Sequence, residues 1–174
     1  MSSDGLRGWV WGRYSQVALV VALSTAVIDQ AHKWWMILGY KIIEKGRVVV
    51  TPFLDLVFVK NTGISYSMFD MEGPRGQYAL AAFALVASIG LWVAVAKDAT
   101  NALMAVSLAL ILGGAIGNGI DRVTLGGVAD FFLLHAFGYS WYVFNIADVA
   151  IVAGVVGLLY ESWQSSRNDA AKPL

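Results

Sequence analysis

The chain has 174 residues, of which 58% are hydrophobic and only 14% are charged. Soluble domains carry about a quarter charged residues, so this composition argues against a soluble domain and indicates a membrane protein. The formal net charge is zero and the basic residues are scattered, which argues against a nucleic-acid-binding surface. The absence of cysteine excludes disulfides, thiolate metal sites and a cysteine nucleophile.

Four apolar segments are predicted to form membrane-spanning helices, at about residues 14–35, 78–96, 102–120 and 144–162, because a span needs roughly 20 mostly apolar residues. The first segment also resembles a signal-peptide core. It continues into Asp29 without a small-residue cleavage site, which favours a retained helix. We therefore expect an all-α membrane protein of four transmembrane helices, with residues 1–174 forming one domain.

Two longer connections join these helices and are expected on the same side of the membrane. Residues 48–59 of the 36–77 connection are rich in β-branched and aromatic side chains, which predicts strands that build a small β-platform. The 121–143 connection is the shorter of the two, with a turn at Gly126-Gly127 followed by the short run Val128-Ala129-Asp130-Phe131-Phe132. The Lys and Arg residues on the two sides do not decide which side is cytoplasmic.

Polar residues of the predicted spans gather at the end that bears both connections. They are Asp29, Asn118, Asp121, Arg122, Asn145 and Asp148, with Gly117 directly before Asn118. Carboxylates inside a membrane are costly and mark functional sites. A transport pathway needs polar groups through the whole membrane depth, whereas this distribution favours a site that works at one interface.

Asp130 and Asp148 are candidates for a pair of catalytic carboxylates. Two close carboxylates share one proton, so that one activates water while the other protonates a scissile carbonyl oxygen. The alternative is that Asp148 caps the last helix and Asp130 is a solvated turn residue, and spacing does not decide between them. A metal site is not expected, because His32 and His135 are far apart in the sequence.

The other polar residues have structural interpretations. Asp121 and Arg122 are expected to pair with each other or to bind backbone groups at the end of the third helix. The alternative is that Arg122 and Asn118 orient a substrate backbone. Asp29 and Lys33, four residues apart, are expected to pair on one helix face. Asn61 is expected in a turn after a strand, with contact between its amide and a peptide substrate as the alternative. His135 is expected in a loop.

The pattern Gly113-x-x-x-Gly117, which includes Gly114, predicts a surface for close helix packing. His32 is expected at the membrane interface.

Five motifs in order, over nearly the whole chain, closely resemble bacterial lipoprotein signal peptidase (signal peptidase II). They are Asp29-Gln30-x-x-Lys33, Asn61-Thr62-Gly63, Gly113-Gly114-Ala115-x-Gly117-Asn118-x-x-Asp121-Arg122, Val128-x-Asp130-Phe131 and Phe144-Asn145-x-Ala147-Asp148. The resemblance implies an aspartyl endopeptidase of the bacterial inner membrane. Such an enzyme removes signal peptides from prolipoproteins, just before the diacylglyceryl-modified cysteine.

The resemblance places the catalytic dyad on Asp130 and Asp148 and implies no cofactor. Supporting residues are expected at Asp29, Lys33, Asn61, Gly114, Asn118, Asp121, Arg122 and Asn145. It also implies cytoplasmic termini and a site near the periplasmic face, with lipid-modified prolipoproteins, membrane lipids and globomycin-type inhibitors as partners. We expect a monomer. The alternatives are a small ion- or proton-coupled transport subunit and a non-catalytic membrane scaffold.

Overall fold

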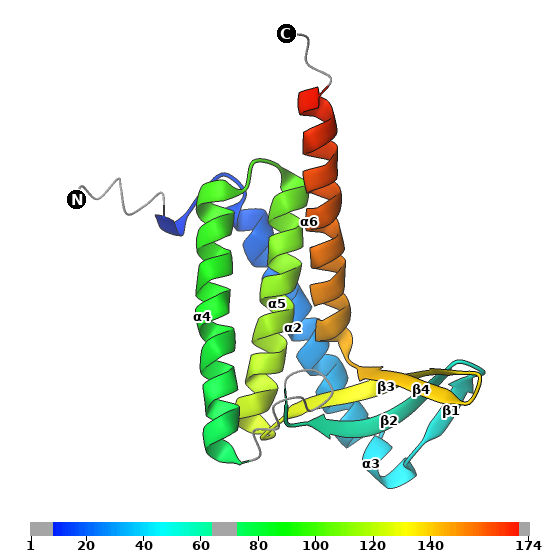
Figure 1. Cartoon of the computed structure of the whole chain (residues 1–174). Helices are drawn as coiled ribbons and strands as arrows, with labels where there is room; N and C mark the ends of the chain where they lie inside the picture. The colour runs from blue at the N-terminus through cyan, green and yellow to red at the C-terminus, as the bar shows by residue number, and fades with distance from the viewer. Residues whose placement is uncertain (1–8, 64–72, 171–174) are drawn as a thin grey trace.

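The structure, a computed structural model, describes residues 9–63 and 73–170. Residues 64–72, part of the predicted 36–77 connection, lie outside the described residues. The long helices are α2 (Ser15–Trp34), α4 (Pro74–Asp98), α5 (Ala102–Thr124) and α6 (Ile146–Ala170). Figure 1 shows these helices as a bundle, with an antiparallel sheet projecting sideways from one end.

Three helices of the described chain, α4, α5 and α6, are long and apolar enough to cross a membrane. Much of their surface is apolar and exposed, for example at Phe83 and Val86 of α4. Helix α2 falls outside this set because polar residues interrupt its last two turns, including Asp29 and Lys33. The prediction of a helical membrane protein is confirmed, while a spanning role for α2 stays a prediction.

Helix α5 forms the centre of the bundle and packs against α2, α4 and α6. Its glycines allow this close packing. A Cβ atom at Gly113 would lie 2.6 Å from the backbone oxygen of Ala22, and one at Gly114 would lie 2.5 Å from that of Ala147. The packing role predicted for the Gly113-x-x-x-Gly117 pattern is therefore confirmed.

The chain leaves α2 through a π-helical turn, η1 (Trp35–Gly39), and a short helix, α3 (Ile42–Lys45). It then enters a sheet of order β1-β2-β3-β4, with β1 at Val48–Thr51, β2 at Leu54–Asn61, β3 at Val128–Ala136 and β4 at Tyr139–Phe144. The strands predicted at residues 48–59 are confirmed. Phe131 of β3 packs with Met36 and Ile42, which ties the sheet to the end of α2.

Three details differ from the sequence-based expectations. The 121–143 connection is not merely short but forms a β-hairpin that completes the sheet. Helix α5 continues past residue 120 to Thr124, so Asp121 and Arg122 lie inside it. His135 belongs to β3 rather than to a loop, and its Nε2 lies 3.1 Å from Oδ1 of the buried Asp55. His32 is half-buried and stacks on Phe132.

Candidate active site

Asp130 is the third residue of β3 and is only 3% exposed. It is therefore not a solvated turn residue. Its Oδ1 accepts a 2.7 Å hydrogen bond from the side-chain amide of Asn145, and the Asn61 side chain also hydrogen-bonds to it. Burial, together with the negative charge of Asp148, raises the pKa of Asp130 to about 7. This carboxyl group is thus poised to hold a proton near neutral pH.

Asp148 lies in the first turn of α6, where Asn145 caps the helix. The Asp148 backbone N–H donates to Asn145 Oδ1 at 3.0 Å, and the Asn145 N–H donates to Asp148 Oδ2 at 3.1 Å. This reciprocal pattern is that of a capping box. The capping role considered for Asp148 is therefore confirmed, but the carboxylate also lies close enough to Asp130 to affect its pKa.

Two asparagine side chains connect the carboxylates. Asn118 of α5 donates to Asp148 Oδ1 at 3.0 Å, and its own oxygen accepts from Asn145 Nδ2 at 3.1 Å. The same Asn145 amide reaches Asp130. Asp130, Asn145, Asn118 and Asp148 therefore form one hydrogen-bonded network that joins β3, α5 and α6.

A buried ion cluster supports this network from the side of α2. Lys33 Nζ lies 2.8 Å from Asp29 Oδ2 and 2.8 Å from Asp121 Oδ2, and it donates to Asn118 Oδ1 at 3.0 Å. The predicted pair of Asp29 and Lys33 is confirmed. The partner of Asp121 is Lys33 of another helix rather than the neighbouring Arg122.

Both carboxylates of this cluster also bind backbone next to the candidate dyad. Asp121 Oδ2 accepts from the N–H of Ala129 at 3.0 Å, and Asp29 Oδ1 accepts from the N–H of Ala147 at 2.9 Å. Ala129 precedes Asp130, and Ala147 precedes Asp148. The lysine and its two carboxylates thus fix the backbone at both candidate catalytic residues.

Arg122 forms the outer part of the site. Its guanidinium donates to Gln77 Oε1 and to the backbone oxygen of Gly63, each at 3.1 Å. Asn61 Oδ1 accepts from the Gly63 N–H at 3.1 Å, which confirms the turn predicted there. Arg122 therefore binds a backbone group, but that of Gly63 after β2 rather than the expected one at the end of its own helix.

Two glutamines contribute to the site but were not among the predicted site residues. Gln30 donates to Asp121 Oδ1 at 2.7 Å and to the backbone oxygen of Gly117 at 3.0 Å. Its position directly after Asp29 in the first motif was the available signal. Gln77, which is buried, donates to Thr62 O at 2.6 Å, and we find no sequence signal that marks it.

A cavity of about 350 Å³ opens beside Asp130. Asn61 and Asp130 provide polar groups, while Val59, Leu133 and Trp141 supply much of an apolar wall. Such a mixture suits a ligand that is largely apolar and carries a few polar groups. Within residues 9–63 and 73–170, no group of three or more His, Asp or Glu side chains is placed to hold a metal ion.

Comparisons with known proteins identify the family of the chain. Residues 21–164 match the model of the family described as Signal peptidase (SPase) II, Peptidase_A8. The chain belongs to the signal peptidase II family. It is 51% identical to a lipoprotein signal peptidase of Rhodopseudomonas palustris, over 86% of this chain and 92% of the relative. It is 49% identical to one from Methylorubrum extorquens, over 83% and 84%.

The fold is similar to that of solved membrane enzymes. One bacterial membrane enzyme, determined by the in meso method, has a TM-score of 0.77 and 28% sequence identity, and the match covers 91% of this chain and 94% of that one. A second has a TM-score of 0.65 and 26% identity. The predicted family and the predicted enzyme class, an aspartic peptidase of the signal peptidase II type that processes prolipoproteins, are confirmed.

Proposed function

We propose that the protein removes signal peptides from diacylglyceryl-modified prolipoproteins, cutting just before the lipidated cysteine, and that Asp130 and Asp148 form its catalytic dyad. The observation that carries the proposal is the network that holds a buried Asp130, with a pKa raised to about 7, beside Asp148. Family membership supports the reaction class.

The geometry supports different roles for the two carboxylates. Asp148 is only half-buried, so its carboxylate stays within reach of water, and it accepts hydrogen bonds from the Asn118 side chain and the Asn145 backbone N–H. Asp130 is buried, and burial favours its protonated form. Asp148 is therefore the general base and Asp130 the general acid.

Hydrolysis then proceeds without a covalent intermediate. Asp148 takes a proton from water as the water oxygen attacks the scissile carbonyl carbon, and Asp130 gives its proton to the carbonyl oxygen. When the C–N bond breaks, Asp148 returns a proton to the leaving amine, and Asp130 recovers one from the tetrahedral diol. The supporting residues Asp29, Lys33, Asn61, Gly114, Asn118, Asp121, Arg122 and Asn145 hold the dyad and the packing around it.

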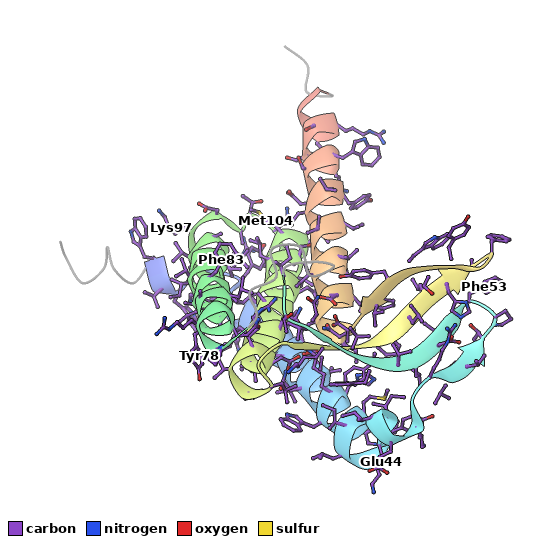
Figure 2. The ribbon with its side chains drawn as sticks, turned by 60° about the horizontal axis from the view of Figure 1, so that its bottom comes forward. Glu44, Phe53, Tyr78, Phe83, Lys97 and Met104 are labelled. Carbon is purple, nitrogen blue, oxygen red and sulfur yellow. The ribbon has the colours of Figure 1, made fainter. Side chains whose placement is uncertain are left out.

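We further propose that α2 also crosses the membrane, which gives four spans with both termini in the cytoplasm. The sheet and the site lie at the end of the bundle opposite Lys97 and the end of α6 (Figure 1, Figure 2). Single cysteine replacements test this orientation, because the chain contains no cysteine and the introduced thiol is the sole reactive one. A membrane-impermeant thiol reagent should label Glu44→Cys from outside and Thr100→Cys only after the membrane is opened. Labelling of Thr100→Cys from outside would invert the topology.

The proposed substrate is held at the depth of the dyad by its apolar helix and its lipid. A buried methylene contributes about 0.8 kcal/mol, so two acyl chains add substantial binding free energy remote from the scissile bond. Membrane lipids would surround this complex, and globomycin-type peptides are its expected inhibitors. One chain supplies both residues of the proposed dyad, which supports a monomer.

Cleavage by the purified protein tests the proposal. In detergent, the lipidated precursor should be cut orders of magnitude faster than the same precursor with a free cysteine, and cleavage should persist in EDTA. Asp130→Asn serves as the inactive control. No cleavage of the lipidated precursor by folded wild-type protein would contradict the proposed function, whereas equal rates on both precursors would contradict only the role of the lipid.

A further inference from the structure

The far end of the sheet carries exposed aromatic side chains that the folding of the chain does not explain. Phe53 in the β1–β2 turn is 60% exposed, Phe137 in the β3–β4 turn is 92% exposed, and Tyr139 at the start of β4 is 71% exposed. We call these three residues the aromatic tip. The backbone oxygen of Phe53 accepts from the N–H of His135, which places the two turns at the same end of the sheet.

Phe137 is also unusual in its conformation. Ala136 pairs with Tyr139, so Phe137 and Gly138 form a two-residue hairpin loop, and both have positive φ, 52° and 81°. Such loops favour Asn-Gly or Gly-Gly, because a side chain larger than Asn is disfavoured in the left-handed region. A fully exposed phenylalanine at this position therefore costs stability without packing against the protein, which points to a contact outside it.

The tip lies at a height where the membrane surface is expected. Figure 1 shows the strands running sideways from the end of the bundle where α6 begins, and their far ends do not extend below the lower ends of α4 and α5. Phe53 marks this far end in Figure 2. With α4, α5 and α6 crossing the bilayer as proposed above, the far ends of the strands lie beside the lower turns of α4 and α5, near the level expected for the lipid headgroups.

The chemistry of the tip fits this position. Residues 46–54 and 133–143 contain no carboxylate, and apart from tyrosine their ionisable side chains are Arg47 and His135, both of which lie against the buried Asp55. Aromatic rings are enriched at membrane interfaces. A deeper position is excluded, because β1 and β4 are the outer strands of the sheet and their unpaired backbone groups cannot enter hydrocarbon.

We propose that the aromatic tip inserts into the interface of the surrounding bilayer and anchors the free end of the sheet there. Strand β3 runs from Asp130 to the tip, about 20 Å at ~3.3 Å per residue. A lipid contact at the tip and the ion cluster at the bundle then support this strand at both ends. The anchor holds Asp130 at a constant height relative to the membrane surface.

Spin-label accessibility tests this proposal on the full chain in lipid nanodiscs. Phe137→Cys and Phe53→Cys each introduce the sole cysteine, and Glu44→Cys on α3, whose side chain is 71% exposed, is the matched control. We expect oxygen, which concentrates in lipid, to relax the labels at 137 and 53 several-fold more than a water-soluble nickel chelate does. The label at 44 should show the opposite order.

Two results would overturn the anchor. If the nickel chelate dominates at 137 and 53 as it does at 44, the tip lies in water. If both reagents are excluded at 137, the tip contacts protein, such as a second copy of the chain, instead of lipid. Prolipoprotein cleavage is measured on the same labelled variants. Variants that cleave the precursor but show either of these two results contradict the anchor and leave the proposed function standing.

Discussion

The side-chain amide of Asn145 donates a 2.7 Å hydrogen bond to Asp130 and a 3.1 Å hydrogen bond to Asn118, while its backbone N–H donates to Asp148. One residue thus contacts both carboxylates of the proposed dyad. Because Asn145 also caps α6, the position of the helix and the position of the dyad are set by the same side chain. This arrangement explains how a residue of a strand and a residue of a helix are held as a pair.

Replacing either carboxylate by its amide should abolish cleavage. In Asp130→Asn and Asp148→Asn the shape of the side chain is kept, but the acid or the base is lost, and such groups contribute about 10²–10⁴-fold to the rate. We expect at least that loss, measured as cleavage of a lipidated precursor, with each variant recovered at normal yield. Substantial turnover by either folded variant would remove that residue from the proposed mechanism.

Cleavage should decrease as the pH rises above neutrality. Burial and the neighbouring Asp148 raise the pKa of Asp130 to about 7, so Asp130 is protonated below this pH and ionised above it. The proposed general acid is the protonated form, so kcat/KM should fall by up to about tenfold per pH unit on the alkaline limb. A rate profile between pH 5 and 9 measures this. A rate that increases through pH 8 would assign the acid role elsewhere.

The stability of Asp130→Asn should depend on pH in a defined direction. The pKa of Asp130 is raised in the folded protein from 3.8 to about 7, so between these values the folded state binds more protons than the unfolded state. The wild-type protein therefore loses stability as the pH rises through this window. The neutral amide does not, so the Tm of Asp130→Asn relative to wild type should rise by several degrees between pH 4 and pH 8. A constant difference in Tm would contradict the raised pKa.

Two glycine-to-alanine variants should have opposite effects. A Cβ atom at Gly117 would lie 2.5 Å from Asp29 Oδ2 and disturb the ion cluster, so Gly117→Ala should lower the free energy of unfolding by about 1–3 kcal/mol. At Gly90 of α4 no atom lies within 4 Å of the added Cβ. Gly90→Ala should therefore be neutral or stabilise the helix by up to about 1 kcal/mol. Thermal unfolding in detergent compares them, and equal effects would show that the contact at Gly117 does not matter.

Much of this architecture could be predicted from the sequence, because hydropathy marks long helices and the motifs mark polar residues at one end. The hairpin of β3 and β4 was missed because β3 is a central strand. Its residues Val128–Phe131 are all buried, although Asp130 is among them, so the run lacks the alternation of buried apolar and exposed polar residues that indicates a strand. A short run of this kind does not distinguish a strand from a buried connection.

Most residues of the candidate site could be predicted from the sequence, but the contacts between them could not. The sequence suggested Arg122 as a partner of Asp121, since they are neighbours, whereas the structure pairs Asp121 with Lys33, 88 positions earlier in the chain. Only the packing of α2 against α5 brings these two charges together. The burial of Asp130 was equally hidden, because it depends on the strands on both sides of β3.

Loss of the Lys33 charge should unfold the site, and removal of a second charge should restore it. Lys33 is buried between Asp29 and Asp121, so Lys33→Met leaves two carboxylates buried without a cation. Breaking a buried pair by removing one partner costs about 3–5 kcal/mol. Lys41→Met is the matched control, since Lys41 is exposed and lies 3.7 Å from Glu44, where such a pair contributes about 0–1 kcal/mol.

The double variant Lys33→Met, Asp121→Asn separates charge from position. Its amide oxygen still accepts from the Ala129 N–H, as Asp121 Oδ2 does at 3.0 Å, but one uncompensated charge is gone. Unfolding in detergent should therefore show Lys33→Met far less stable than Lys41→Met, with part of the loss recovered in the double variant. Cleavage should recover in parallel, because the backbone before Asp130 is held again. If Lys33→Met proves as stable as Lys41→Met, the ion cluster does not support the dyad.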